Sequence, residues 1–336
     1  MSSDRPIFVV GCPRSGTTML QLMLHAHPRI ALPPESRFLL TAYRRRHEFG
    51  DLRDPARHAA LARSIVNSPQ FEDLGLDRAE TIAAITAAPP TLGSAVGTVF
   101  QRYAERFGKP RWGDKRPAYL RHLPVIRRLF PDAQIITIMR DGRDCVASLK
   151  DTPWPPHDLA TMIDHWARSA DAALTAARRY PADVHHQIRY EDLVADPEHH
   201  LRAICRFLGE EYDPAMTHPC EQAREVVPEY KTWHSLTREQ VTAARVSSWQ
   251  TRLDEAEVRR CEAVFGDRLA RFGYQASAVP RSTPAVRATR AWLGLRHRLT
   301  PARMVAEDCW GALRSGSRGP ALAARLTTAE RAYDRS

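Results

Sequence analysis

A glycine loop at residues 11–18 carries the side chains best suited to bind an anion. Its sequence is G-C-P-R-S-G-T-T, and it lies between a short apolar stretch and a segment whose apolar residues have helical spacing. Backbone N–H groups at such a turn bind oxyanions, and the dipole of the following helix favours negative charge there. Arg14 can bind two oxygens through its guanidinium, and Thr17 and Thr18 add hydroxyl donors. The loop therefore predicts a phosphate-binding site formed by Pro13, Arg14, Ser15, Gly16, Thr17 and Thr18.

The loop differs from the phosphate-binding loop of nucleoside triphosphatases at one position. In the pattern G-x-x-x-x-G-K-[ST], Gly11, Gly16 and Thr18 match, but Thr17 occupies the position of the lysine. That lysine reaches the β- and γ-phosphates, so its absence argues against a magnesium-bound triphosphate. The loop instead suits a nucleotide with a shorter 5′ chain. A glycine turn with a purely structural role is the alternative.

A second candidate phosphate site follows the apolar stretch I-I-T-I-M at 135–139. Arg140 stands at the carboxyl end of this expected strand, which is where open parallel sheets bind their ligands. Ser148 follows two helical turns later, so the two side chains could hold a second phosphate. An arginine at a strand end can equally be a salt-bridge partner.

The two motifs together resemble those of the sulfotransferase family. P-R-S-G-T-T follows the first expected strand and R-D-G-R-x₄-S follows a later one, and the resemblance covers roughly residues 5–275. It implies 3′-phosphoadenosine-5′-phosphosulfate (PAPS) as co-substrate and adenosine 3′,5′-bisphosphate as product. The first motif would hold the 5′-phosphosulfate and the second the 3′-phosphate. The resemblance also implies that no metal is required, since this donor has no γ-phosphate.

Within the family, the segment from the glycine loop to P-E-S-R-F-L-L resembles the tyrosylprotein sulfotransferase branch and its bacterial relatives. The resemblance implies that Glu35 is the general base and that Lys115, in G-D-K-R-P, acts beside Arg14 near the transferred group. Glu35 could instead be a first-turn helix acid, and Lys115 a solvated loop lysine. If Glu35 is not the base, the next candidates are His157, Asp158 and His165.

Two looser similarities add nucleotide contacts. Tyr190, in Y-E-D-L, resembles the family's tyrosine near the adenine, although it could be an ordinary half-buried aromatic residue. The segment A-R-V-S-S-W-Q-T-R-L resembles the late loop that closes over the nucleotide, and it offers Arg245, Ser247 and Arg252. It departs from the R-K-G segment of the cytosolic sulfotransferases, and the histidine base motif of that class is also missing.

Alternating strand and helix patterns predict an α/β fold with a central parallel sheet in three layers, of the P-loop type. The expected strands lie at 6–10, 29–33, 111–115, 133–140 and 184–190. The expected helices lie at 15–26, 35–46, 117–131, 141–150, 159–180 and 197–209. An alanine-rich helical region is inserted at about 50–110 in a sulfotransferase domain of residues 1–275. An Arg/Ala-rich basic extension, helical in pattern, follows at 276–336.

The composition limits the partners. A net charge of +10 favours an anionic partner, but no motif interleaves basic and aromatic residues, so nucleic acid is not expected. No apolar run approaches the ~20 residues of a membrane span, and the cleavable signal pattern is missing, which predicts a cytoplasmic protein. The six cysteines are dispersed and expected to be free thiols, and no metal site is predicted. A homodimer is compatible with the sequence.

The predicted function is sulfuryl transfer from PAPS to an acceptor hydroxyl by in-line attack, with Glu35 as the base. The alternatives are a degenerate P-loop kinase or nucleoside triphosphatase and a non-catalytic nucleotide-binding protein. The sequence leaves the acceptor open among a peptide tyrosine, a phenolic compound and a sugar hydroxyl. The resemblance favours the tyrosine.

Overall fold

A computed structural model of the chain describes residues 4–152, 158–220, 242–277 and 284. One compact unit combines the described residues of Met1–Ser36 and Phe100–Val286. The other holds Arg37–Val99, and the remaining residues assigned to it, Arg287–Ser336, lie outside the described part. The basic extension at 276–336 is therefore almost wholly outside the described residues.

The first unit is built on a five-stranded parallel sheet with the strand order β2-β3-β1-β4-β5. The strands are β1 (Ile7–Gly11), β2 (Ile30–Ala31), β3 (Arg111–Lys115), β4 (Gln134–Met139) and β5 (His185–Arg189). Every residue of β1 and β4 is buried, as the continuous apolar runs of these two strands predict for the centre of a parallel sheet.

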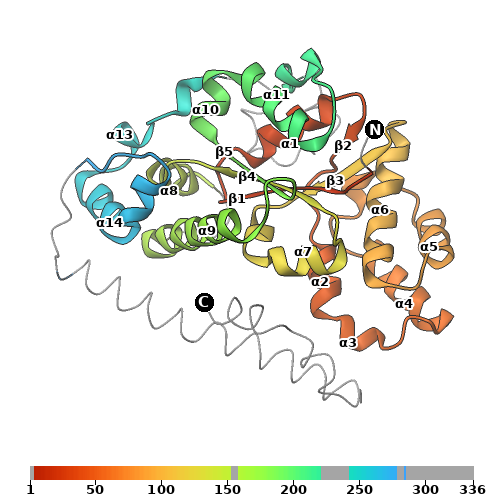
Figure 1. Cartoon of the computed structure of the whole chain (residues 1–336). Helices are drawn as coiled ribbons and strands as arrows, with labels where there is room; N and C mark the ends of the chain where they lie inside the picture. Colours follow the sequence, from red (N-terminus) through yellow and green to blue (C-terminus); the bar gives the residue numbers. More distant parts are fainter. Residues whose placement is uncertain (1–3, 153–157, 221–241, 278–283, 285–336) are drawn as a thin grey trace. The chain divides into compact units, whose positions relative to one another are not determined.

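Helices cover both faces of this sheet (Figure 1). One face carries α1 (Thr17–Ala26), α10 (Tyr190–Ala195) and α11 (Pro197–Leu208), and the other carries α7 (Leu123–Leu129) and α9 (Leu159–Arg179). The apolar side chains of α1, α10 and α11 pack on those of β1 and β4, among them Leu20, Leu201 and Ile136. The predicted three-layer α/β fold with a central parallel sheet is thus confirmed.

The described part of this unit holds further helices. They are α8 (Gly142–Lys150), α13 (Trp249–Arg252), α14 (Glu255–Phe265), α15 (Asp267–Arg271) and the 3₁₀ helices η2 (Pro117–His122), η3 (Pro214–Thr217) and η5 (Ala243–Arg245).

The second unit is helical in its described residues, as the alanine-rich pattern predicts. Its helices are α2 (Phe38–Arg44), α3 (Arg46–Phe49), α4 (Pro55–Val66), η1 (Glu72–Leu74), α5 (Arg78–Ala87) and the first part of α6 (Leu92–Arg106).

One predicted helix is wrong in its extent. The segment at 117–131 forms the 3₁₀ helix η2 and then a separate α-helix, α7, with Pro124 in its first turn. Proline has no N–H to donate and its ring excludes the carbonyl four residues earlier, so it fits the start of a helix and not the interior.

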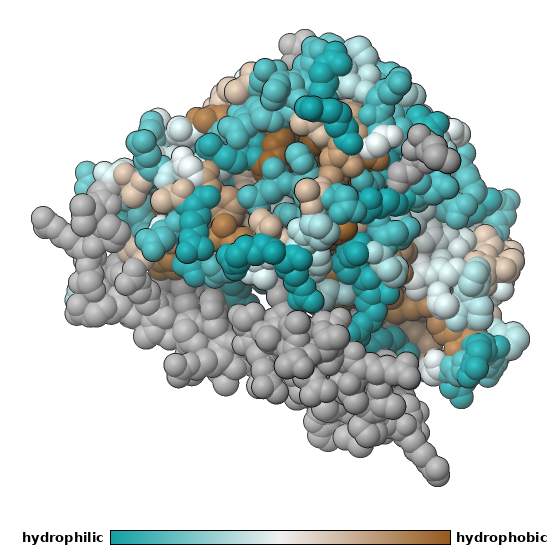
Figure 2. All heavy atoms as spheres, in the orientation of Figure 1, coloured by the Kyte–Doolittle hydropathy of each residue, from teal (hydrophilic) through white to brown (hydrophobic). Residues whose placement is uncertain are grey.

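On the face drawn in Figure 2, hydrophilic residues predominate and apolar ones show as small patches between them. No helix among the described residues combines the length and the hydropathy of a bilayer crossing. The five described cysteines, Cys12, Cys145, Cys205, Cys220 and Cys261, are free thiols, as predicted, and Cys309 lies outside the described residues.

Candidate functional site

The glycine loop leaves the carboxyl end of β1 and leads directly into α1. Gly16 caps this helix with φ 92°, and Arg14 also has a positive φ of 70°. A Cβ on Gly16 would lie 2.6 Å from the Tyr190 ring, and one on Gly11 would lie 2.4 Å from the carbonyl oxygen of Ile138. Both contacts are too short for a side chain, so the tight loop requires glycine at these two positions.

Ser15 holds this loop against the neighbouring strand. Its hydroxyl oxygen lies 2.7 Å from the carbonyl of Cys12 and 2.9 Å from that of Ile138 in β4, and its backbone N–H also donates to Cys12. The Ser15 side chain is fully buried. The structure therefore places the Ser15 hydroxyl in the support of the loop, whereas Pro13 and Thr18 are half-buried.

Arg14 reaches from the loop to α8. Its Nε donates to the hydroxyl of Ser148 at 2.9 Å, and its carbonyl accepts a hydrogen bond from Arg140 at 3.3 Å. Burial lowers the pKa of Arg14, and the positive charge of Arg140 lowers it further. Two guanidinium groups and a hydroxyl thus gather at one place, where a doubly charged anion would relieve the repulsion between the two cations.

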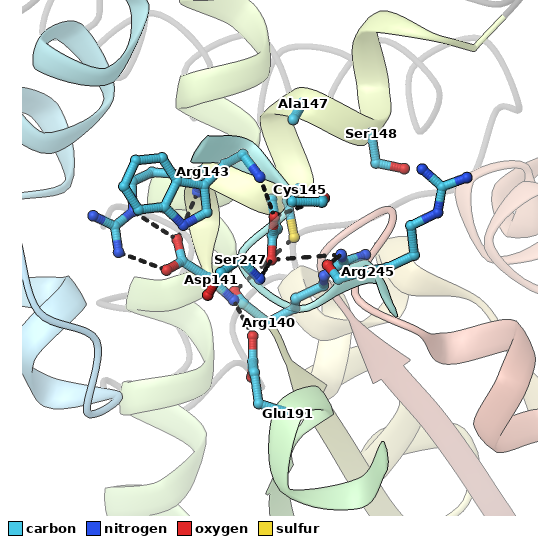
Figure 3. A network of polar contacts seen from close by, with 12 residues as sticks. Arg140, Asp141, Arg143, Cys145, Ala147, Ser148, Glu191, Arg245 and Ser247 are labelled. Carbon is cyan, nitrogen blue, oxygen red and sulfur yellow. Dashed lines mark hydrogen bonds and ion pairs between the residues drawn. The ribbon is translucent and has the colours of Figure 1, made fainter. Parts of the chain in front are cut away.

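Arg140 is buried at the end of β4, and its partners come from three directions. It donates to the carbonyl of Arg245 and lies 3.5 Å from the Asp144 carboxylate (Figure 3), and its guanidinium is 4.5 Å from the centre of the Tyr190 ring. Its Nε is buried without a hydrogen-bond partner in the described part of the chain. An unsatisfied buried donor costs ~1–3 kcal/mol, so this nitrogen is suited to an oxygen of a ligand.

The late loop is fastened to α8 through Asp144. The Asp144 carboxylate accepts hydrogen bonds from the backbone of Ser247 (2.9 Å) and Trp249 (2.8 Å) and from the Ser248 hydroxyl (3.0 Å). Ser247 has a positive φ of 56° and lies close to Arg140 (Figure 3). This arrangement places the loop beside the expected 3′-phosphate site.

Arg252 binds the end of α8. It donates to the carbonyl of Ala147 at 2.9 Å and pairs with Asp151, both near the carboxyl end of α8. Its guanidinium is thus engaged within the protein, and its positive charge also lowers the pKa of Arg14.

Lys115 and Glu35 lie on the other side of the loop and contact each other. The Nζ of Lys115 is 3.1 Å from Oε2 of Glu35 and 3.2 Å from the Thr18 hydroxyl. The Lys115 side chain is 2% exposed and that of Glu35 33%, so the carboxylate is open to a partner while the ammonium is enclosed. Arg116 adds a second positive charge, 3.9 Å from Oε1 of Glu35.

The sheet explains why these residues meet. Lys115 is the last residue of β3 and pairs with Val9 of β1, while Glu35 follows the end of β2. Carboxyl ends of neighbouring parallel strands share one edge of the sheet. Glu35 precedes α2, which begins at Phe38, so the alternative of a first-turn helix acid does not describe it, and burial excludes a solvated Lys115.

Tyr190 lies between the two halves of the site, at the start of α10. Its ring packs under Gly16 of the loop and against Arg140, and burial raises the pKa of its phenol. Tyr190 therefore supports the conformation of both anion-binding elements.

Three residues of the site were not predicted from the sequence: Asp114, Arg116 and Asp144. For Arg116 the signal was its place next to Lys115, and for Asp144 its position on the first turn of the helix that follows Arg140. Asp114 also lies next to Lys115, but no spacing in the sequence pointed to its partners. Asp158, one of the alternative bases, accepts from the Thr161 N–H and caps α9, whereas His157 lies outside the described residues.

Comparisons with known proteins show the family to which the chain belongs. The model of the sulfotransferase family matches residues 6–214, and the chain belongs to that family. Protein-tyrosine sulfotransferase 1 of Danio rerio is 28% identical over 291 residues, which cover 83% of this chain and 75% of that protein. Nodulation protein NoeE of Sinorhizobium fredii is 29% identical over 296 residues, which cover 80% of this chain and 66% of that protein.

Solved structures of sulfotransferase domains have a similar fold. The sulfotransferase domain of the Synechococcus PCC 7002 olefin synthase matches with a TM-score of 0.58 at 25% identity, over 82% of this chain and 96% of that one. The sulfotransferase domain from the curacin biosynthetic pathway matches with a TM-score of 0.54 at 20% identity, over 82% and 99%. The family resemblance predicted from the two motifs is thereby confirmed.

Proposed function

We propose that this protein transfers the sulfuryl group of PAPS to an acceptor hydroxyl, with a phenol such as a tyrosine side chain as acceptor. The observation that carries the proposal is the position of Lys115, whose ammonium joins the Thr18 hydroxyl of the anion-binding loop to the Glu35 carboxylate. A cation is thus hydrogen-bonded to the loop and a base is hydrogen-bonded to that cation, as a group transfer between two oxygens requires.

The residues present fit the donor nucleotide. The loop amides with Arg14, Thr17 and Thr18 would hold the 5′-phosphosulfate, and the unpartnered Nε of Arg140 with Ser148 would hold the 3′-phosphate. Tyr190 and the late loop at Ser247 would lie along the nucleoside. When bound, PAPS supplies a sulfuryl group whose bond to the phosphate oxygen breaks as the bond to the acceptor oxygen forms.

The side chains of this protein would then accept the proton of the acceptor hydroxyl and neutralise the charge on the leaving oxygen. Glu35 takes the proton of the acceptor hydroxyl, a role worth ~10²–10⁴-fold in rate. Lys115 and Arg14, which contact Thr18 and Ser148, would neutralise the negative charge that grows on the departing phosphate oxygen. Lys115 also holds the Glu35 carboxylate beside the loop, at 3.1 Å from its ammonium.

Two observations favour a phenol as the acceptor. The pKa of a tyrosine phenol is about 10, well below that of an alkyl alcohol, so a carboxylate base can assist its attack. The animal relatives are named protein-tyrosine sulfotransferases.

Binding of the product nucleotide is the first test. Adenosine 3′,5′-bisphosphate should raise the melting temperature of the protein by several degrees at concentrations far above its Kd, with or without EDTA. ATP with magnesium should have a smaller effect, because no lysine follows Gly16 in the loop. Stabilisation by ATP–magnesium that exceeds that of the bisphosphate would favour a degenerate kinase or triphosphatase.

Transfer itself is tested with PAPS and a tyrosine peptide, followed by the mass of the peptide. A peptide heavier by one sulfuryl group supports the proposal. Nucleotide binding without transfer to any peptide, phenol or sugar would instead favour a non-catalytic binding protein.

A further inference from the structure

Asp114 is a fully buried carboxylate at the end of β3, one residue before Lys115. Its Oδ2 accepts hydrogen bonds from the hydroxyls of Tyr119 (2.6 Å) and Ser36 (3.2 Å), and its Oδ1 accepts one from the backbone N–H of Lys115 (2.8 Å). Burying a carboxylate is costly unless it is well hydrogen-bonded, and these three bonds offset that cost.

Two of these donors are adjacent to, or part of, the catalytic pair. Ser36 is the next residue after Glu35, and the N–H belongs to Lys115 itself. The segment that carries Glu35 lies between β2 and α2 and forms no helix or strand of its own. The bond from Ser36 to Asp114 therefore joins this irregular segment to the rigid end of β3.

We propose that Asp114 is the positioning residue of the site, holding the Glu35 segment against the Lys115 strand end so that base and cation stay in contact. The inference rests on the proposed function, because it assigns Asp114 a role in the chemistry that Glu35 and Lys115 perform. Asp114 acts only through its two neighbours and does not itself reach the reacting atoms. A displacement of about 1 Å in such a pair can lower the rate by ~10²-fold.

The ionisation of Asp114 supports this role. Burial raises its pKa to about 7, with a smaller contribution from the nearby charge of Glu35 and against the bonds from Tyr119, Lys115 and Ser36 that favour the anion. The other charged side chains close by include the Lys115 ammonium, which pairs with Glu35, and Arg116, which faces Tyr119. A protonated Asp114 carries an O–H that needs an acceptor, and the Ser36 hydroxyl, which has the longest of the three bonds, can accept it by ceasing to donate to Oδ2. The connection to Ser36 should therefore change as the pH falls below about 7.

The test is a double-mutant cycle of Asp114→Asn and Glu35→Gln, with PAPS and a phenolic acceptor. Asp114→Asn should lower kcat about 10- to 100-fold, while the KM for PAPS and the affinity for adenosine 3′,5′-bisphosphate change less than about 2-fold. In the Glu35→Gln background the same substitution should lower kcat by less than about 3-fold, because the base that it positions is already gone. The pH profile of Asp114→Asn should lack the inflection near 7.

Asp164→Asn is the matched control. Asp164 is a buried carboxylate on α9 that pairs with Arg168 at 3.1 Å, so its loss matches the burial of Asp114 without touching Glu35 or Lys115. Its kcat should stay within about 2-fold of the unsubstituted chain. Should Asp114→Asn fail to fold, Ser36→Ala removes only the one hydroxyl and should still lower kcat by about 3- to 10-fold.

The results of these experiments distinguish the role of Asp114 from the proposed sulfuryl transfer. Wild-type turnover by Asp114→Asn or by Ser36→Ala, or a full effect of Asp114→Asn on top of Glu35→Gln, overturns the role of Asp114 and leaves the proposed function standing. An unsubstituted chain that transfers no sulfuryl group overturns the proposed function and the role of Asp114 with it.

Discussion

The Glu35 carboxylate is half-exposed and paired at 3.1 Å with a buried Lys115. Its exposure leaves it accessible to an acceptor hydroxyl, as a general base requires. We expect Glu35→Gln to keep the fold and the affinity for adenosine 3′,5′-bisphosphate, because the expected phosphate contacts come from other residues. Turnover should fall by ~10²-fold or more, since no carboxylate remains to take the proton. Steady-state kinetics with PAPS and an unactivated phenol give this number.

The defect of Glu35→Gln should shrink with a nitrophenol, which loses its proton with less help. If the variant turned over like the unsubstituted chain with both acceptors, Glu35 would not be the base. His165 on α9 would then be the next residue to substitute among those described, because the carboxylate of Asp158 already caps that helix.

Arg140 should bind the 3′-phosphate through the nitrogen that has no partner within the described chain. Arg140→Ala is expected to weaken adenosine 3′,5′-bisphosphate by ~1–3 kcal/mol and to weaken adenosine 5′-phosphate far less, because the latter has no 3′-phosphate. Calorimetric titration with both nucleotides checks this. An equal loss for both would place Arg140 elsewhere on the nucleotide.

Ser148→Ala should differ less than Arg140→Ala in its effect on the affinities for adenosine 3′,5′-bisphosphate and adenosine 5′-phosphate. The Ser148 hydroxyl accepts from Arg14, which belongs to the 5′ side of the site, so its loss frees that guanidinium as well. We expect the affinity for both nucleotides to fall, by about 1 kcal/mol each. A loss confined to adenosine 3′,5′-bisphosphate in the same titrations would show that the bond to Arg14 contributes little.

The sequence revealed those site residues whose types and spacing form a local motif. Arg14, Arg140 and Ser148 belong to two short segments, and Glu35 and Lys115 follow from the resemblance. Asp114 and Asp144 were not found in this way, because each also binds a serine hydroxyl from a distant part of the chain. Ser36 lies 78 residues from Asp114, and Ser248 lies 104 residues from Asp144. Only the folded sheet brings such pairs together.

At the scale of elements, the junction between β1 and α1 depends on Gly16. We expect Gly16→Ala to destabilise the protein by ~2 kcal/mol or more and to weaken nucleotide binding, because the new Cβ would lie 2.6 Å from the Tyr190 ring at φ 92°. Gly209→Ala is the control, since Gly209 has φ 76° and no atom within 4 Å of the Cβ position. It should cost only the backbone strain, ~1–2 kcal/mol, and leave binding unchanged.

Urea unfolding and titration with adenosine 3′,5′-bisphosphate measure both variants. Equal losses of stability together with unchanged binding in both would mean that the contact between Gly16 and Tyr190 does not shape the loop.

Elements with a strong pattern were predictable, and those whose limits depend on packing were not. The runs in β1 and β4 are apolar throughout, and α9 has the long amphipathic repeat of a surface helix, so all three follow from sequence. The strand expected at 29–33 is reduced to Ile30–Ala31, because it pairs with only two residues of β3 at the sheet edge. Hydrogen-bond partners along an edge are a tertiary property that no local pattern records.

At the scale of the whole molecule, stability should depend on pH through groups with opposite effects. Burial lowers the pKa of His185 to about 4, so the folded state binds fewer protons than the unfolded state and stability falls as the pH drops from about 6.5 to 4. The raised pKa of Asp114 acts in reverse, because the folded state then holds its proton more tightly and stability falls as the pH rises from about 4 to 7.

Substitution of each group should therefore change the pH profile in opposite directions. Asp114→Asn should make the gain in unfolding free energy between pH 4.5 and 7 larger than in the unsubstituted chain, and His185→Gln should make it smaller. Urea titrations at the two pH values measure both slopes. Parallel profiles for all three proteins would mean that neither group keeps its shifted pKa.

The strand order of the sheet also determines when the protein can fold during its synthesis. Ile7 of β1 lies beside Gly113 of β3 and Gln134 of β4, so both partners leave the ribosome more than a hundred residues after it. At ~5–20 residues per second, the apolar stretch Ile7–Val10 stays unpaired for roughly 5 to 25 seconds. In the meantime α4 and α5, which follow closely in sequence and pack on each other, can already form. The nascent chain should therefore need a chaperone on its first strand until β4 has been made, and a ribosome stalled shortly before residue 134 should carry a chain that proteases still cut at β1.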